Sequence, residues 1–152
     1  MSGGGKHALP AWVTDLASYP FTFEVQARFA DLDLMGHINN VALVGIFQEG
    51  RYHFFNRVGA GDEQHWQRIV LRRQAVDYLR EGMSDDPITL GLGVTEIGRS
   101  SVQIMHAAFQ AGQCIAVNET VSVATGEGGP APLRDAVRER FEAWRINARQ
   151  EA

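Results

Sequence analysis

The feature that most constrains the fold of this chain is one long apolar segment in its first half. Apolar residues occupy most sides of the run from Val41 to about Val58. A helix that is apolar on most sides is a buried helix. Asn39 is suited to cap its start, and the segment Gly59-Ala60-Gly61-Asp62 ends it. A single buried helix needs a sheet to cover it, so the remainder of the chain has to supply strands.

Alternating polar and apolar residues predict those strands. After Pro20, apolar residues at every second position from Phe21 to Phe29 predict a half-buried strand. The short turns Gly98-Arg99-Ser100 and Ala111-Gly112-Gln113 make the strands that they join antiparallel. Four further strands are predicted over residues 69–81, 88–95, 102–109 and 115–123.

The two ends of the chain lead to different predictions. Leu133, Val137, Phe141 and Trp144 recur at helical spacing among charged residues, which predicts an amphipathic C-terminal helix beginning near Pro132. Residues 1–20 are predicted to be a flexible lead-in, although 10–19 have the pattern of a helical turn that caps the domain, and 147–152 are predicted to be a tail. The domain, 21–146, is predicted to be α+β, with a curved antiparallel sheet wrapped around a long central helix.

Composition excludes several classes of protein. The 152 residues suit one domain, and the net charge of −4 with a pI near 5.7 argues against a nucleic-acid-binding protein, which is usually basic. Cys114 is the one cysteine, so neither a disulfide framework nor a cysteine-based zinc cluster is expected. The sequence shows no apolar run long enough for a membrane helix and no signal-peptide core near its start, so a cytoplasmic location is expected.

The polar segment between the first strand and the buried helix carries the chemistry. Asp31 and Asp33 stand two apart at a strand end, and Gly36-His37 and Asn39-Asn40 follow at the helix start. A helix N-terminus offers unpaired amide N–H groups and partial positive charge, which suit a developing oxyanion. A carboxylate nearby can act as a general base or a nucleophile. The segment therefore predicts an acyl-transfer site without a metal ion or a Ser-His-Asp triad.

The stretch from Arg28 to Asn40 also resembles a known family. An aromatic residue followed by D-x-D-x-x-G-H-x-N-N, and then by Glu49-Gly50-Arg51 in the helix, is similar to the hotdog-fold acyl-CoA thioesterases of the 4-hydroxybenzoyl-CoA thioesterase group. In those relatives the helix ends E-x-x-R, one residue longer than here. The resemblance covers about residues 21–142 and implies a hotdog fold that hydrolyses an acyl-CoA, or an acyl-carrier-protein thioester, to a free acid and a thiol.

The resemblance also implies roles for individual residues. Asp33 matches the catalytic carboxylate, and the backbone N–H of Asn40 matches the donor that polarises the thioester carbonyl. His37, together with Asn39, would shape the site or form hydrogen bonds in it. Gly36 would let the chain turn closely past the acyl group.

The nucleotide end of coenzyme A is implied to lie elsewhere on the protein. Arg99 and Ser101 match positions that contact it in relatives, and a guanidinium suits phosphate. Relatives form dimers or tetramers with sites at the dimer interface, so Asp33 and Arg99 could come from different chains. Leu43 replaces a tyrosine of many relatives, which points to a different acyl pocket. No metal, no cofactor besides the coenzyme A of the substrate, no nucleic acid and no membrane partner are expected.

Simpler interpretations stand beside these. Asp33 could cap the helix or form an Asx-turn, and Asp31 is better explained as a structural residue that bonds backbone amides. His37 could be a core histidine, and Asp31, Asp33 and His37 are a metal-ligand set by type alone. Glu119, in phase with apolar neighbours in its strand, could line the site or mark the end of the strand's inner face.

Rival functions also remain open at this point. A hotdog hydratase or dehydratase usually carries its Asp and His further apart, in a motif that this sequence does not show. A non-catalytic domain that binds acyl-CoA without cleaving it, or a domain that serves only assembly, is compatible with the same residues.

Overall fold

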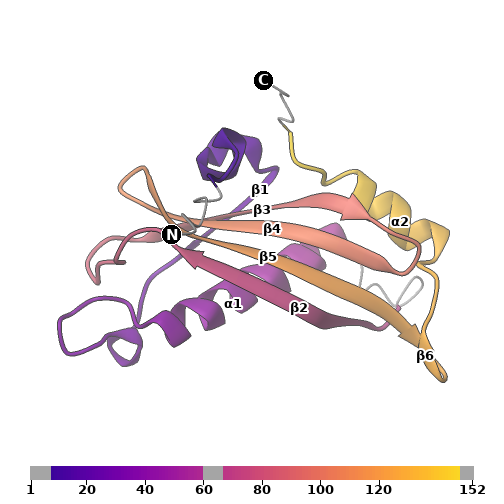
Figure 1. Ribbon diagram of the computed structural model, residues 1–152, viewed down its shortest axis with the longest axis horizontal. Coiled ribbons are helices and arrows are strands. Elements are labelled where there is room, and N and C mark those ends of the chain that lie inside the picture. The colour runs from indigo at the N-terminus through magenta and orange to yellow at the C-terminus, as the bar shows by residue number, and fades with distance from the viewer. Residues whose placement is uncertain (1–7, 60–66, 148–152) are drawn as a thin grey trace, which may run out of the picture.

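The computed structural model describes residues 8–59 and 67–147, and in them a curled antiparallel sheet wraps around one long helix (Figure 1). The helix, α1, spans Asn40–Val58. The strands are β1 (Phe21–Val25), β2 (Ile69–Tyr78), β3 (Ile88–Ile97), β4 (Ser101–Gln110) and β5 (Gln113–Gly126), and the two-residue strand β6 (Gly129–Pro130) pairs with β5. Their order across the sheet is β1-β3-β4-β5-β2. This arrangement confirms the predicted α+β hotdog fold.

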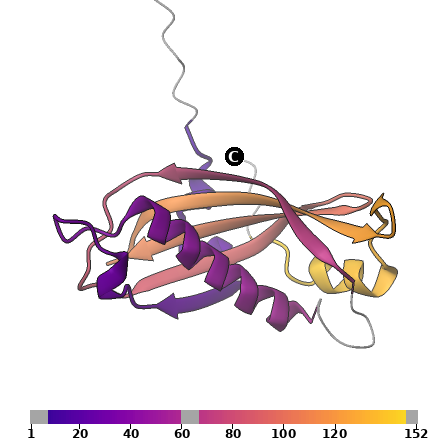
Figure 2. The ribbon, with the colours of Figure 1, turned by 90° about the horizontal axis from the view of Figure 1, so that it is seen from below.

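Helix α1 begins and ends where the sequence predicts. The side chain of Asn39 accepts a hydrogen bond of 2.8 Å from the N–H of Val41, and Gly59 ends the helix in the left-handed conformation that glycine tolerates best. Phe47 and Phe54 are fully buried against the sheet, which α1 crosses on one face (Figure 2). A Cβ at Gly50 would lie 2.7 Å from Leu90, so this glycine lets the helix approach β3 closely.

The first strand is shorter than its alternating pattern predicts. β1 ends at Val25, and a 3-10 turn spans Phe29–Asp31, where Phe29 is 92% exposed instead of half-buried. The cause is the carboxylate of Asp31, which accepts hydrogen bonds from the backbone N–H and the guanidinium of Arg28. These local bonds close a turn that overrides the periodicity.

The part of the predicted lead-in from Ala11 to Tyr19 is not flexible. It forms two 3-10 turns, Ala11–Thr14 and Leu16–Ser18, that cover the face of the sheet opposite α1. Val13 and Tyr19 are buried there, and the Tyr19 hydroxyl donates to the Val13 carbonyl at 2.6 Å. The lead-in prediction is therefore wrong for this stretch, whereas the expected capping turn is confirmed. Residues 1–7, and residues 148–152 of the predicted tail, lie outside the described residues.

The C-terminal helix α2 spans Asp135–Glu142, so it begins after Pro132 and ends before Trp144. Val137 and Phe141 are its buried residues, and the Phe141 ring packs edge-on against Phe55 of α1 at 5.7 Å. It therefore closes one end of the core. Neither described helix is both long and apolar enough to span a membrane.

A buried histidine of β4, the middle strand of the sheet, lies against α1. His106 is fully buried, its Nδ1 donates to the Asn118 carbonyl oxygen at 2.9 Å, and its ring meets Phe47 edge-on. Burial, reinforced by the positive charge of buried Arg51, lowers the pKa of His106 to about 3. The imidazole is therefore neutral in the folded protein at physiological pH.

This histidine makes stability depend on pH. The pKa of His106 in the folded protein is below its value of about 6.5 in the unfolded chain. As pH falls below 6.5, the imidazole therefore becomes protonated in the unfolded chain while it stays neutral in the folded protein, which favours unfolding. As pH falls from 6.5 to 4, we expect the free energy of unfolding of wild type to decrease by up to about 1.4 kcal/mol per pH unit more than that of His106→Gln. Urea denaturation of both proteins at several pH values measures this difference, and parallel curves would contradict it.

Candidate active site

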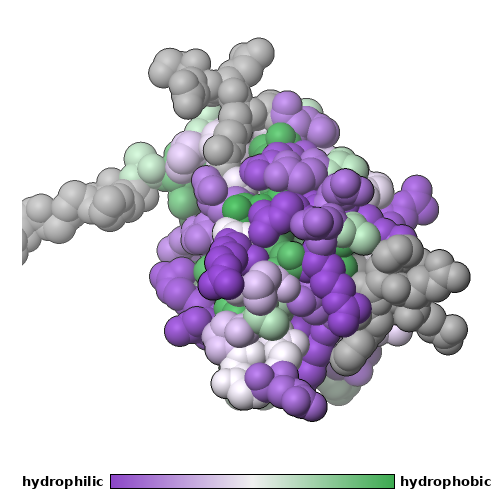
Figure 3. Space-filling model, turned by 90° about the vertical axis from the view of Figure 1, so that its right-hand side faces the viewer, coloured by the Kyte–Doolittle hydropathy of each residue, from purple (hydrophilic) through white to green (hydrophobic). Residues whose placement is uncertain are grey.

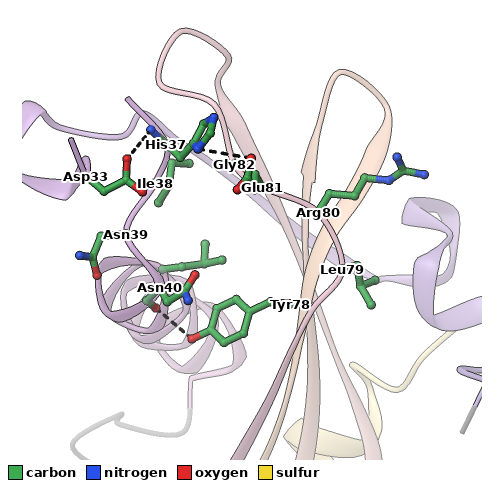
Figure 4. A pocket seen from close by; sticks show the side chains of 11 residues that line it. Asp33, His37, Ile38, Asn39, Asn40, Tyr78, Leu79, Arg80, Glu81 and Gly82 are labelled. Atoms are coloured by element: carbon green, nitrogen blue, oxygen red, sulfur yellow. Dashed lines mark hydrogen bonds and ion pairs between the residues drawn. The ribbon is translucent and has the colours of Figure 1, made fainter. Parts of the chain in front are cut away.

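A pocket of about 670 Å³ opens where the N-terminus of α1 meets the end of β2 (Figure 4). Two stretches far apart in the sequence form its walls: the loop before α1 with the first turn of α1, and the end of β2 with the segment that follows it. The lining residues are Asp33, His37, Ile38, Asn39, Asn40, Leu43, Tyr78, Leu79, Arg80, Glu81 and Gly82. The structure therefore brings Asp33, His37, Asn39 and Asn40 together, as the sequence predicts.

Asp33 is held by the turn that it closes. Its Oδ1 accepts from the N–H of Met35 at 2.8 Å and from the N–H of His37 at 3.0 Å. The backbone closes the same loop, because the Asp33 N–H donates to the His37 carbonyl at 2.8 Å, and Gly36 supplies the positive φ of 77° that the turn requires. The Asx-turn interpretation is thus confirmed, but Oδ2 accepts no hydrogen bond from the described residues. Asp33 is exposed and has one oriented oxygen available for chemistry.

The start of α1 supplies the complementary donor. Asn40 is the first residue of the helix, so its N–H is one of those that the helical ladder leaves without a carbonyl partner. Asn39 has a defined task as the N-cap, and its own N–H donates to the Asp31 carbonyl at 2.7 Å. The Tyr78 hydroxyl donates to the Asn40 carbonyl at 3.0 Å and ties this turn to β2. The amides and the helix dipole together favour negative charge at this position.

Asp31 and Asp33 differ in their surroundings, although they stand two apart. Asp31 is 6% exposed and pairs with the Arg28 guanidinium at 2.9 Å. Hydrogen bonds from the side chain and backbone of Arg28 hold the pKa of this carboxyl below its usual value. Asp31 does not line this pocket, and the hydrogen bond that it accepts from the backbone N–H of Arg28 fits the structural role predicted for it.

The segment after β2 forms the opposite wall of the pocket, and the motif did not reveal it. Tyr78, Glu81 and Gly82 line the pocket, and the His37 ring lies 3.3 Å from the Glu81 carboxylate. The Ile38 N–H donates to the Gly82 carbonyl at 2.8 Å. No local pattern in the sequence encodes the pairing of residue 38 with residue 82, so the motif could not predict this wall.

Arg99 and Ser101 lie at the other end of the sheet from Asp33. Arg99 lies in the turn between β3 and β4. The carbonyl of the next residue, Ser100, accepts a hydrogen bond from the N–H of Ala124, and Ala124 pairs with Ile69 at the start of β2. Arg99 therefore lies beside the start of β2. The pocket lies at the end of β2, and this ten-residue strand is roughly 30 Å long. Hydrophilic side chains dominate the Arg99 end of the molecule (Figure 3). A single chain therefore does not bring these predicted substrate-binding residues to Asp33.

Two further titratable side chains, Glu119 and Cys114, do not line the pocket. The neighbour of Glu119, Asn118, lies opposite His106, which contacts α1, so Glu119 points from the other face of β5, 3.9 Å from Arg73. Burial raises the pKa of the Cys114 thiol to about 11, which makes it a poor nucleophile. Among residues 8–59 and 67–147, no group of three or more His, Cys, Asp or Glu could hold a metal ion.

Comparisons with known proteins show the family to which the chain belongs. The thioesterase-like superfamily matches residues 27–141, so the chain belongs to that superfamily. A solved thioesterase from Thermus thermophilus, complexed with coenzyme A and zinc, is 35% identical with a TM-score of 0.73 over 83% of this chain and 95% of that one. A predicted thioesterase from Bacillus stearothermophilus is 27% identical with a TM-score of 0.75, over 84% and 98% of the two chains.

A relative without a described activity is also similar. The uncharacterized protein YsmA of Bacillus subtilis is 30% identical over 89 residues, which are 59% of this chain and 60% of that protein. The match thus spans less than two thirds of the relative's length.

The ion pair of Asp31 is testable as a structural element. We expect Asp31→Asn to lower the free energy of unfolding by about 1–3 kcal/mol at pH 7, because it weakens bonds to a buried group. The loss should shrink as pH falls, because the carboxylate's contribution disappears through its lowered pKa. Denaturant unfolding measures the change, with Asp77→Asn, an exposed aspartate of β2, as the control. Equal stability of the two variants would contradict the assignment.

Proposed function

We propose that this protein is an acyl-CoA thioesterase that hydrolyses an acyl-CoA to a free acid and coenzyme A. The observation that carries the proposal is the pairing, in one pocket, of an oriented Asp33 carboxylate with the N-terminal amides of α1. The chemistry needs no cofactor besides the coenzyme A of the substrate. The site is open to solvent, which supplies the second substrate, water.

The residues divide the reaction between them. The thioester carbonyl oxygen accepts from the Asn40 N–H, so the charge that develops on it meets the positive end of the helix. Asp33 Oδ2 either takes a proton from water, which then attacks the carbonyl carbon, or attacks that carbon itself to form an anhydride that water cleaves. In both routes the C–S bond breaks and the thiolate leaves, finally taking up a proton. A thiolate leaves readily, so no strong general acid is required.

Support for a coenzyme A substrate comes from a relative and from the chain itself. The thioesterase from T. thermophilus was solved with coenzyme A. The guanidinium of Arg99 suits the phosphates of such a ligand, together with the nearby Ser101 hydroxyl. Acyl carrier protein, whose phosphopantetheine arm carries the same thioester, is the alternative carrier of the acyl group.

A homodimer would reconcile the distance between Asp33 and Arg99. β2 is an edge strand of ten residues, and an antiparallel copy paired with it would place the start of one β2 beside the end of the other. Arg99 of one subunit would then approach Asp33 of its partner. We therefore propose a homodimer, which can pair further into a tetramer, with cytoplasmic location as the accompanying expectation.

Asp33→Asn tests the proposed chemistry. We expect hydrolysis of acyl-CoA to fall at least tenfold, because the amide is neither base nor nucleophile, while folding survives. The measurement is thiol release over short, medium, long and aromatic acyl-CoAs, with Asp135→Asn on α2 as the control. Full activity of folded Asp33→Asn would refute the role of Asp33. Tight binding without hydrolysis by wild type would indicate a binding domain.

Arg99→Ala tests the proposed nucleotide contact. Removing one phosphate partner should raise KM for acyl-CoA about tenfold while leaving kcat nearly unchanged, because the contact forms in ground state and transition state alike. Acyl-pantetheine, which lacks the nucleotide, should be hydrolysed equally by both proteins. An equal KM for acyl-CoA in wild type and variant would contradict the contact.

A further inference from the structure

The contact between His37 and Glu81 joins two segments that the motif does not connect. His37 belongs to the loop before α1, and Glu81 to the segment after β2, yet His37 Nδ1 lies 3.3 Å from Glu81 Oε2 (Figure 4). Both side chains line the pocket that contains Asp33. A carboxylate accepts hydrogen bonds and donates none, so a neutral His37 that donates to Glu81 carries its proton on Nδ1. The other ring nitrogen, Nε2, is then an acceptor in the neutral imidazole.

Backbone hydrogen bonds fix the positions of both partners. His37 is tied to Asp33 by two bonds, one through its carbonyl and one through its N–H. On the other side, residue 83 forms a β-bridge with His37, and the Ile38 N–H donates to the Gly82 carbonyl. A Cβ at Gly82 would lie 2.7 Å from Ile38, so the two segments are in close contact.

A buried side chain anchors the segment that carries Glu81. Gln110, at the end of β4, is 5% exposed. Its Oε1 accepts from the Met83 N–H at 2.8 Å, and its Nε2 donates to the carbonyls of Met83 at 2.8 Å and Asp86 at 2.9 Å. The Glu81 side chain is 75% exposed, so its pairing adds little to stability. Its backbone is nevertheless held in place, and an anchored exposed carboxylate can orient a ring without stabilising the fold.

We propose that Glu81 is a positioning residue that holds His37 in the Nδ1–H tautomer, so that Nε2 accepts an amide N–H from the pantetheine arm of the substrate. This inference rests on the proposed function, because it requires a thioester whose carbonyl lies between Asp33 and Asn40. The arm must leave the pocket over its rim, where the His37 side chain is 23% exposed. Pantetheine carries two amide N–H groups, and a lone pair on the rim is complementary to such a donor.

Three variants separate orientation from charge. Glu81→Met removes the acceptor, Glu81→Gln keeps an acceptor oxygen without the charge, and Glu139→Met makes the same change at an exposed position of α2 as the control. We expect Glu81→Met to raise KM for acyl-CoA about three- to tenfold with kcat within twofold of wild type. Glu81→Gln and Glu139→Met should keep KM close to that of wild type. A large fall in kcat with unchanged KM would overturn the proposed substrate contact.

A spectroscopic measurement tests the tautomer without any catalysis. In protein labelled with ¹⁵N at histidine, the spectrum at pH 9, above the usual imidazole range, distinguishes Nδ1–H from Nε2–H. We expect His37, assigned by its loss in His37→Gln, to be Nδ1–H in wild type and Glu81→Gln. In Glu81→Met the Nε2–H form should gain population. An Nε2–H ring in wild type, or an unchanged ring in Glu81→Met, would overturn the positioning role.

Binding of a non-hydrolysable thioether analogue of acyl-CoA separates this inference from the proposed function. Titration calorimetry should show three- to tenfold weaker binding to Glu81→Met than to Glu81→Gln, even if wild type hydrolyses no thioester. Equal affinities would refute the contact between His37 and the arm. Absence of hydrolysis with the expected difference in affinity would refute only the catalytic proposal.

Discussion

The burial of α1 in the curl of the sheet is the constraint on which the rest of this structure depends. One face of the helix packs on the sheet, where Phe47 and Phe54 have no exposed surface, whereas Val41 and Tyr52 on the opposite face are exposed, so the expectation of a helix buried on most sides is wrong. Burying its body requires both ends to emerge at the edges of the sheet. Its N-terminal end therefore lines a pocket at one end of the core, beside the end of β2. The same packing that stabilises the domain creates the electrophilic side of the pocket.

Two aspartates of one short segment show how local environment assigns different roles to the same residue type. Asp31 is buried, receives hydrogen bonds from Arg28 and holds the turn that ends β1. Asp33 is exposed and uses one oxygen to close its loop, so the other remains available. The first carboxylate holds the turn that ends β1, and the second closes the following turn while both it and the start of α1 line the pocket.

The pocket and the residues expected to contact the nucleotide are separated by the length of one strand. Asp33 and Arg99 lie at opposite ends of the sheet because short turns force successive strands to run back and forth, and each turn lies at one end or the other. The exposed edge of β2 offers a way to bring the two ends together through a second copy. A hotdog subunit can in this way be a complete folding unit while its proposed site depends on two subunits.

The sequence by itself determined the elements with strong local signals. The bounds of α1, the Asn39 cap, most strands, and the grouping of Asp33, His37, Asn39 and Asn40 all follow from residues close together in the chain. Tertiary structure decided what depends on distant partners. Tyr78, Glu81 and Gly82 reach the pocket because β2 returns beside the start of α1. Residues 11–19 cover the outer face of the sheet because that face is apolar. Glu119 points away from α1 because its neighbour Asn118 lies opposite His106 on the inner face of the sheet. Periodicity shows that a strand has two faces, but only packing selects which face lies toward the helix.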